Sequence, residues 1–283
     1  MRLAILSPTP GYDLYADVWP QSFERYRQVL TEAGVTAEQA PWTAPLPEGF
    51  DAALGLGAWG YHLQPQAWLD ILNGWKNGPP LLNAPSVMAW NTRKTYLAEL
   101  AGRGAPVVPT LTVAGAPSDA DLERARQDFG SEILVVKPDI AASGQGASKL
   151  RPGDPIPTGL EDVLVQPFMD AVSGEGELSL FYFGGQFSHA VRKVAAKGDF
   201  RVQAEYGGAQ TPTTAPIEAL EAARAVLATA PSPIAYARVD MVRGPDGRFL
   251  LMELELIEPE LYLGMAPDGG RLFAEAIREA IGG

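Results

Sequence analysis

Residues 235–256 read AYARVDMVRGPDGRFLLMELEL, with two runs of alternating residues on either side of an Asp-Gly pair at 246–247. Val, Leu, Tyr and Phe occur often in strands, and an Asp-Gly pair between two such runs is typical of a β-hairpin with a two-residue loop. A longer symmetric loop over 245–248 gives the same register. The stretch therefore predicts antiparallel strands over 235–242 and 249–256.

Four charged side chains meet on one face of this hairpin. The register places Asp240 opposite Glu253 and Arg238 opposite Glu255, because strand side chains alternate between two faces. The other face is expected to carry Leu250, Met252, Leu254 and Leu256. Carboxylates that face each other across a ladder repel, so the pattern predicts a divalent cation held by oxygen ligands, as Mg²⁺ is. The alternative is a solvated face on which Arg238 pairs with Glu255.

Composition excludes several classes of site. The 283 residues are 46% hydrophobic, enough for a large core divided into two or three lobes. The absence of cysteine excludes disulfides, thiolate zinc sites and cysteine nucleophiles, and only two histidines are present. The net charge of -12 argues against a nucleic-acid partner but leaves a nucleotide pocket open. Without a signal peptide or an apolar run of roughly 20 residues, we expect a cytoplasmic protein with no membrane partner.

Strand and helix signals alternate before residue 85. The expected elements are a strand over 3–6, a helix over 21–33, a strand over 52–56 and a helix over 65–75. They predict a doubly wound α/β lobe. The loops Ser7–Tyr15 and Gly57–His62 are rich in glycine and aromatic residues, and loops at the carboxyl ends of parallel strands commonly bind ligands. The alternative is that their aromatic residues pack a lobe interface.

Two lysines and a glycine-rich loop form a second group of candidates. Lys94 lies in a predicted helix over 87–102, and Lys137 lies near the end of the apolar strand 133–138. The following residues 141–147, AASGQGA, have backbone N–H groups that can approach phosphates closely. The loop lacks the Gly-Lys-Ser/Thr ending of a Walker loop. A plain hairpin turn is the alternative.

The next segments suggest a place for a nucleotide base and a basic cluster. The run 163–169 contains Pro167, which excludes a regular central strand and leaves an exposed backbone edge that could read adenine. A hairpin over 178–193 follows, and His189 on it is expected to be a packed residue. The basic cluster comprises Arg192, Lys193, Lys197 and Arg201. Helices are predicted after a Ser118–Asp121 capping box and over 217–229 and 271–281.

Taken in order, these motifs resemble the ATP-grasp superfamily over about residues 86–260. The preceding lobe is similar to the domain found before ATP-grasp in glutathione synthetase and D-alanine:D-alanine ligase. The compact length and the run GDFRVQ at 198–203 also resemble small ATP-grasp proteins grouped with the cycloserine-forming cyclo-ligase. The implied fold class is α/β and α+β, a doubly wound lobe followed by a two-lobed ATP-grasp fold. The implied domains are 1–85 for substrate, 86–165 as a lid, and 166–283 for catalysis and metal binding.

The resemblance implies a role for each motif. Phosphate-binding positions match Lys94, Lys137 and the closing loop with Ser143, Gly144 and Gly146. Adenine and ribose positions match Gln166, Pro167, Phe168, Met169 and Glu177, with the carbonyl of Pro167 and the N–H of Met169 facing the base. Metal positions match Asp240, Glu253 and Glu255. Catalytic positions match Arg238, Arg192 and Arg201, followed by Gln203 and the Gly207-Gly208 pair.

One position departs from the family pattern. Relatives commonly have asparagine where this chain has Glu255, and the extra charge should tighten cation binding. The sequence leaves open whether one or two Mg²⁺ ions bind. It also leaves open whether Glu255, or Glu258 and Glu260, complete the coordination shell of the metal. Mn²⁺ is expected to substitute for Mg²⁺.

The chemistry implied is that of an ADP-forming carboxylate–amine ligase or cyclo-ligase. A small carboxylate, an amino acid or a derivative, takes the γ-phosphoryl group of ATP and becomes an acyl phosphate, which an amine or an internal nucleophile attacks. The alternatives are a small-molecule kinase on the same scaffold and a non-catalytic ATP-binding protein, the latter disfavoured by the presence of Arg238. Relatives commonly form homo-oligomers, and the sequence does not reveal this chain's oligomeric state.

Overall fold

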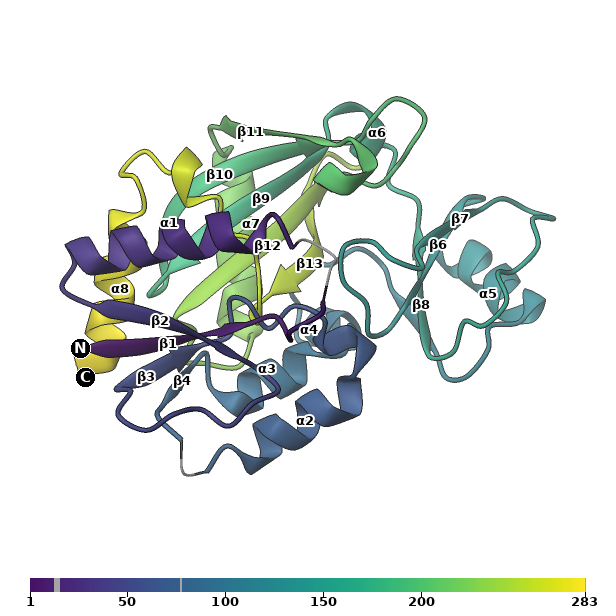
Figure 1. Ribbon diagram of the computed structural model, residues 1–283. Coiled ribbons are helices and arrows are strands. Elements are labelled where there is room, and N and C mark those ends of the chain that lie inside the picture. The colour runs from purple at the N-terminus through teal and green to yellow at the C-terminus, as the bar shows by residue number, and fades with distance from the viewer. Residues whose placement is uncertain (13–15, 77, 283) are drawn as a thin grey trace.

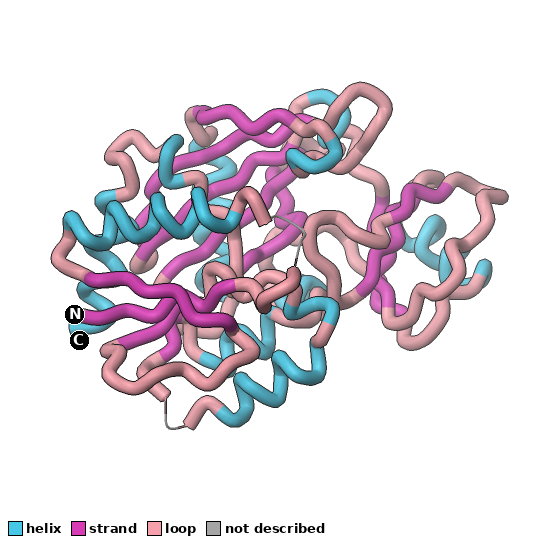
Figure 2. The backbone as a smooth tube through the Cα atoms, in the orientation of Figure 1, coloured by secondary structure: helices cyan, strands magenta, loops and turns pink. Residues whose placement is uncertain are grey.

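The computed structural model describes residues 1–12, 16–76 and 78–282. Its strands form three sheets, and the termini lie side by side at one end of the molecule (Figure 1). The sheet of β5 to β8 stands apart from the other two at the opposite end (Figures 1 and 2). None of the helices in the described ranges has both the length and the apolar character needed to cross a membrane.

The first sheet is parallel and has the order β2-β1-β3-β4. Its strands are β1 (Arg2–Ser7), β2 (Thr36–Pro41), β3 (Ala52–Leu54) and β4 (Leu81–Leu82). The helices α1 (Trp19–Glu32) and α2 (Pro65–Gly74) lie near the predicted positions. The sequence prediction missed β2, whose residues TAEQAP lack the apolar alternation of a strand.

The second sheet is antiparallel and has the order β5-β8-β6-β7. Its strands are β5 (Leu111–Val113), β6 (Leu134–Pro138), β7 (Ser148–Leu150) and β8 (Val163–Pro167), and α5 (Asp119–Phe129) packs against β6 and β8. The predicted capping box of Ser118 and Asp121 is confirmed. The prediction that Pro167 excludes a central strand was wrong, because β8 lies inside the sheet and Pro167 is its last residue.

The third sheet is antiparallel and has the order β11-β10-β9-β12-β13. Its strands are β9 (Glu177–Phe183), β10 (Gln186–Val194), β11 (Ala209–Thr213), β12 (Tyr236–Arg243) and β13 (Phe249–Glu255). The helix α7 (Ile217–Thr229) packs on β12 and β13, and α8 (Arg271–Gly282) packs on β9 and α1. Short helical segments are η1 (Tyr61–Leu63), α3 (Pro85–Asn91), α4 (Tyr96–Gly102), α6 (Ala171–Gly174), η2 (Ala204–Tyr206) and η3 (Leu263–Met265).

The β12–β13 hairpin has the predicted residue pairing but a different loop and a bulge. Asp240 pairs with Glu253 and Arg238 with Glu255, as predicted. The connecting loop is longer and asymmetric, with Gly244 N donating to Arg248 O at 2.7 Å. A bulge between Asp240 and Met241 shifts the register by one residue and cancels the effect of the loop.

The bulge also changes which apolar residues share a face. Leu251 joins Leu254 and Leu256 in one buried cluster. Leu250 and Met252 pack instead with the cluster around Val242. The expectation that Leu250, Met252, Leu254 and Leu256 fill a single face was therefore wrong.

The outer edge of β13 is bonded to the segment that precedes the second sheet. Leu251 N donates to Pro106 O at 2.7 Å, and Val108 N donates to Leu251 O at 3.0 Å. Further along, the Asn91 side chain donates to Leu254 O and accepts from Leu256 N, each at 2.9 Å. These bonds hold fixed the backbone between Glu253 and Glu255.

The predicted helix over 87–102 is divided into α3 and α4. Asp139, which follows β6, accepts from Thr95 N at 3.0 Å, and its backbone carbonyl accepts from Lys94 N at 2.9 Å. The Thr92 hydroxyl bonds back to Met88 O at 2.8 Å. These contacts compete with the helical hydrogen bonds and place Lys94 in a turn rather than in a helix.

Candidate active site

A cavity of about 670 Å³ lies among the first sheet's loops, the glycine-rich loop and the β12–β13 hairpin. The N-terminal loops, which were predicted to form a ligand site, contribute Tyr12, Trp59, Tyr61 and His62 to the cavity lining. Residues 13–15 of the predicted Ser7–Tyr15 loop lie outside the described residues. Trp59 also packs against Trp19, and Tyr61 against Trp68, so the aromatic residues contribute to packing as well.

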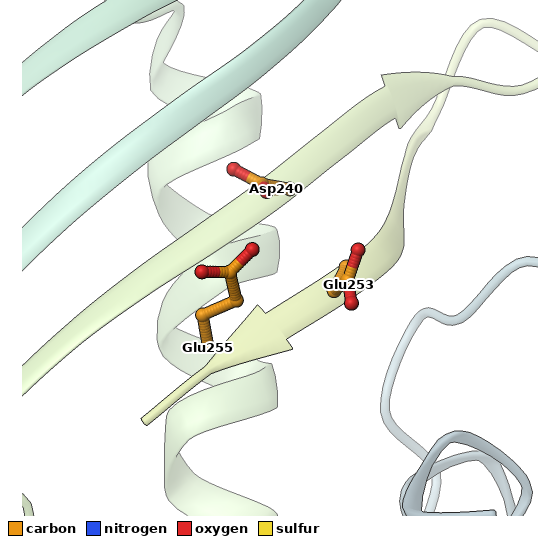
Figure 3. Close-up of side chains that lie close together, drawn as sticks. All are labelled: Asp240, Glu253 and Glu255. Atoms are coloured by element: carbon orange, nitrogen blue, oxygen red, sulfur yellow. The ribbon is translucent and has the colours of Figure 1, made fainter. Parts of the chain in front are cut away.

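Three carboxylates from the hairpin converge at this cavity. Asp240 lies on β12, with Glu253 and Glu255 on β13, and one oxygen of each lies within 4.8 Å of the others (Figure 3). Asp240 is buried, and the two glutamates are partly buried. Convergent, largely desolvated carboxylate oxygens are the donor set that a hard divalent cation such as Mg²⁺ prefers. The residues present therefore fit a magnesium ion.

Two cations hold Asp240. Arg238 Nε lies 3.1 Å from both of its carboxylate oxygens, and Lys193 Nζ lies 3.1 Å from one of them. Arg238 also donates to Glu255. Burial opposes ionisation of Asp240, but Arg238 and then Lys193 outweigh it and hold its pKa at about 2. The Arg238–Glu255 pair that was weighed as an alternative is thus present together with the acidic cluster.

Negative charge is less fully balanced around Glu255. Burial, only partly offset by Arg238, raises the pKa of Glu255 to about 7. Burial and the neighbouring Glu255 raise the pKa of Glu258, which also lines the cavity, to about 8. A bound cation would relieve both effects. Glu260 is engaged elsewhere, since it accepts from the Ser22 hydroxyl at 2.7 Å and from Tyr262 N at 3.1 Å.

Lys94 connects the candidate metal ligands to the glycine-rich loop. Its Nζ lies 3.0 Å from Glu253 and also donates to Ala141 O. Burial would lower the pKa of Lys94, but Glu253 outweighs burial and raises it. The lysine is therefore held as a cation at the cavity wall.

Other predicted phosphate-binding residues lie close by. Burial lowers the pKa of Lys137. The charge of Glu253 opposes this lowering, and the charge of Lys94 adds to it. Ser143 lines the cavity, and its φ of 55° lies in the left-handed region. Gly144 lies against the Gln203 side chain, where a Cβ would stand 3.1 Å from Gln203 Oε1. Gly146 packs on Pro138 in the same way.

The predicted nucleotide-base segment spans the end of β8 and the turn before α6, outside the cavity lining. Phe168 N donates to Ile133 O at 2.8 Å, and the Gln166 side chain donates to Thr110 Oγ1 at 2.9 Å. Both groups are therefore used within the protein. Glu177 is buried and bonds to Lys193 at 2.8 Å, and burial raises its pKa.

The basic cluster is divided between the cavity and the surface. Lys193 points into the cavity, whereas Arg192 donates to Glu175 O at 2.7 Å. Arg201 pairs with Asp199 at 2.8 Å and stacks on Tyr206, so it does not line the cavity either. The roles predicted for Arg192 and Arg201 remain predictions. The sequence analysis named Lys193 only as a member of the basic cluster, although its position opposite Glu177 could have assigned it to the site.

The two histidines have different surroundings. His189 is buried, stacks on Phe181 at 4.3 Å and bonds to Leu261 O at 3.1 Å. Burial lowers its pKa to about 4. These contacts agree with the expectation of a packed residue. His62, by contrast, lines the cavity.

Comparison with known proteins identifies relatives along nearly the whole chain. No protein-family model matches. The cycloserine biosynthesis protein DcsG of Streptomyces lavendulae is 29% identical over 274 residues, which cover 88% of this chain and 90% of that protein. The crystal structure of D-cycloserine synthetase DcsG aligns with a TM-score of 0.83 and 25% identity over 99% of this chain and all of that one.

More distant solved structures have the same fold. D-alanyl-alanine synthetase A from Vibrio cholerae aligns with a TM-score of 0.68 and 16% identity over 100% of this chain and 97% of that one. The ATP-grasp ligase PsnB, in a complex with a precursor variant, Mg and ADP, aligns with a TM-score of 0.63 and 16% identity. The alignment covers 99% of this chain and 98% of that one. The comparisons confirm the predicted fold class and the resemblance to ADP-forming ligases of the ATP-grasp type.

Proposed function

From the ATP-grasp ligase fold that the chain shares with these relatives, we propose that it activates the carboxylate of a small amino acid or derivative with ATP and Mg²⁺. An amine or an internal nucleophile then displaces phosphate. The observation that carries the proposal is the convergence of Asp240, Glu253 and Glu255 with Lys94 and Arg238 at one cavity. In the proposed division of the chain, residues 86–165 form a lid over this cavity.

The first chemical step transfers the γ-phosphoryl group of ATP to the substrate carboxylate. Lys94 and Lys137 hold the phosphates, and Ser143, Gly144 and Gly146 cover them. Asp240, Glu253 and Glu255 hold one or two Mg²⁺ ions, with Mn²⁺ as a substitute. When bound, the ion neutralises charge that develops on the transferring phosphoryl group.

The second step replaces the acyl phosphate by an amide. Arg238 Nη2 contacts both Glu255 and Asp240, and Lys193 contacts the same Asp240 oxygen, so we assign these two fixed cations to the oxyanion. Fixed donors in a water-poor site stabilise such an oxyanion more strongly than water does. Adenine is assigned to the backbone of Pro167 and Met169, and ribose to Glu177.

A product-resolved assay tests this proposal. The protein is incubated with ATP, Mg²⁺ and a panel of amino acids and other carboxylates, with and without amines, and ADP, phosphate and amide are measured. We expect ADP and phosphate in equal amounts, only when a carboxylate substrate is present. A stable phosphorylated product without free phosphate would identify a kinase instead. Nucleotide binding without turnover on any substrate would identify an ATP-binding protein.

The similarity to DcsG guides the choice of substrates for this assay. DcsG is named for cycloserine biosynthesis, so serine derivatives that could close a ring belong in the panel beside simple amino acids. A cyclic product would appear without any added amine. A linear amide would require the amine.

A further inference from the structure

His62 lines the cavity, and no described residue lies in full hydrogen-bond geometry with either of its ring nitrogens. The residue lies in η1, directly after the loop that carries Trp59 and Gly60. Both nitrogens are shielded from bulk solvent, yet neither Nδ1 nor Nε2 is bonded. Tyr61, next to it, packs edge-on against the ring at 6.1 Å and helps to fix its place.

Unpaired polar atoms in such a place require an explanation. Nearly all buried polar groups in proteins are hydrogen-bonded, and exceptions often mark a functional site. The partners of His189 show that this chain satisfies a histidine where it is only structural. His62 differs because its neighbours across the cavity are Lys94 and the glycine-rich loop.

These neighbours place the ring close to the reacting groups. Lys94, whose charge acts on His62, is the residue that contacts Glu253 and Ala141. The imidazole therefore faces the region between the proposed metal ligands and the loop that covers the phosphates. The cations Lys94, Lys193 and Arg238 cannot accept a proton while they remain charged, and Asp240, Glu253 and Glu255 are committed to cations.

We propose that His62 is the general base of the second half-reaction, accepting a proton from the nitrogen that attacks the acyl phosphate. The inference rests on the proposed ligase function. In this step the nitrogen lone pair forms the new C–N bond at the acyl carbon while an N–H proton passes to a ring nitrogen of His62. The C–O bond to the phosphate then breaks with its electron pair. The imidazolium returns the proton to the departing phosphate, so that the histidine is restored.

The electrostatic surroundings favour a neutral ring that can accept the proton. Burial, followed by the positive charge of Lys94, lowers the pKa of His62 below its ordinary value near 6.5. The Gln145 amide approaches the ring and partly offsets this lowering. Lys94 is the charged group that acts on the ring among the described residues. At neutral pH the imidazole is thus ready to act as a base.

The test separates the two half-reactions in the His62→Gln variant. Both D- and L-forms of alanine and serine are supplied with ATP, Mg²⁺ and either an amino-acid amine or hydroxylamine. Hydroxylamine traps an acyl phosphate as a hydroxamate and needs little help from a base. We expect hydroxamate formation at the wild-type rate and amide formation lower by roughly 10²- to 10⁴-fold, the usual contribution of a general base. Amide formation by the wild type should also fall at acid pH as His62 becomes protonated, and the variant should lack this dependence.

Matched variants make the result specific. Leu63→Gln changes the neighbouring residue, which is exposed, and should keep both activities. Glu258→Gln removes a carboxyl group that lines the same cavity and should not show the selective loss. Equal loss of hydroxamate and amide in His62→Gln, or no loss of either, would overturn the role of His62. A wild-type protein that forms no hydroxamate from any carboxylate would instead reject the ligase function itself.

Discussion

The ammonium of Lys94 lies 3.0 Å from the carboxylate of Glu253, which joins a predicted phosphate ligand to a predicted metal ligand. The turn between α3 and α4 supplies the lysine, and β13 supplies the glutamate. The site is thus assembled across two parts of the chain before any ligand binds. Loss of either partner should affect both nucleotide and metal binding.

Replacing Lys94 should weaken ATP binding. In Lys94→Met one charged phosphate contact is lost, about 1.5 to 3 kcal/mol or roughly 10- to 150-fold in affinity. Isothermal titration with a non-hydrolysable ATP analogue measures this loss, and Lys76→Met, at an exposed position of the first lobe, serves as the control. An unchanged affinity in Lys94→Met would reject its assignment to phosphate.

Replacing either facing carboxylate should abolish Mg²⁺-dependent turnover. Asp240→Asn and Glu253→Gln each remove a negative oxygen ligand while keeping the side-chain size. Asp246→Asn, at the exposed turn of the same hairpin, should leave turnover unchanged. Phosphate release is measured over a range of Mg²⁺ concentrations. Normal turnover in both site variants would contradict the metal assignment.

Glu255→Asn should remain active, because asparagine is the residue that the family resemblance implies at this position. The variant lacks one negative charge near the cation, so half-maximal turnover should require on the order of 10-fold more Mg²⁺. Titration of phosphate release with Mg²⁺ gives the shift. Complete inactivity, in a variant that unfolds at the wild-type temperature, would show that Glu255 does more than hold the cation.

Arg238→Lys should separate catalysis from nucleotide binding. Lysine keeps the charge between Asp240 and Glu255 but cannot reproduce the forked contacts of the guanidinium. We expect kcat to fall on the order of 10²- to 10³-fold while ATP affinity is retained. Arg243→Lys, on the same strand and paired with Glu175 at the surface, is the control. If ATP affinity falls as much as kcat, Arg238 serves binding instead.

His189 should make the fold less stable in acid. Its pKa is about 4 in the folded protein and near 6.5 in an unfolded chain, so the unfolded state binds more protons between these values. The stabilisation is complete above pH 6.5 and is lost as pH falls toward 4. Urea unfolding at several pH values should show a steeper decline for the wild type than for His189→Leu. Parallel curves would contradict this assignment.

Local patterns predicted much of the fold. Apolar periodicity located α7 from Ile217 to Thr229, and the Ser118 capping box located the start of α5. The facing of Asp240 and Glu253 also followed from the sequence. The predicted loop was nevertheless wrong. The pairing is correct because the bulge beside Asp240 compensates for the longer turn, and no residue type in the sequence indicates that bulge.

Contacts distant in sequence account for what could not be predicted. The break before α4 depends on Asp139, which comes from another sheet, and periodicity within 87–102 cannot reveal it. Likewise, whether Arg192 or Lys193 enters the cavity depends on the exact register of β10 against β9. Distinguishing His62 from His189 required knowing which ring nitrogens find partners.

The bonded outer edge of β13 has a consequence for assembly. Exposed edge strands offer unpaired N–H and C=O groups on which another chain can add a strand. On β13 those groups at Leu251, Leu254 and Leu256 are taken up by Pro106, Val108 and Asn91 of the same chain. Two copies of this protein therefore cannot join their third sheets through β13. Any homo-oligomer must form through a surface other than this edge, which leaves the strand of the proposed metal ligands Glu253 and Glu255 undisturbed.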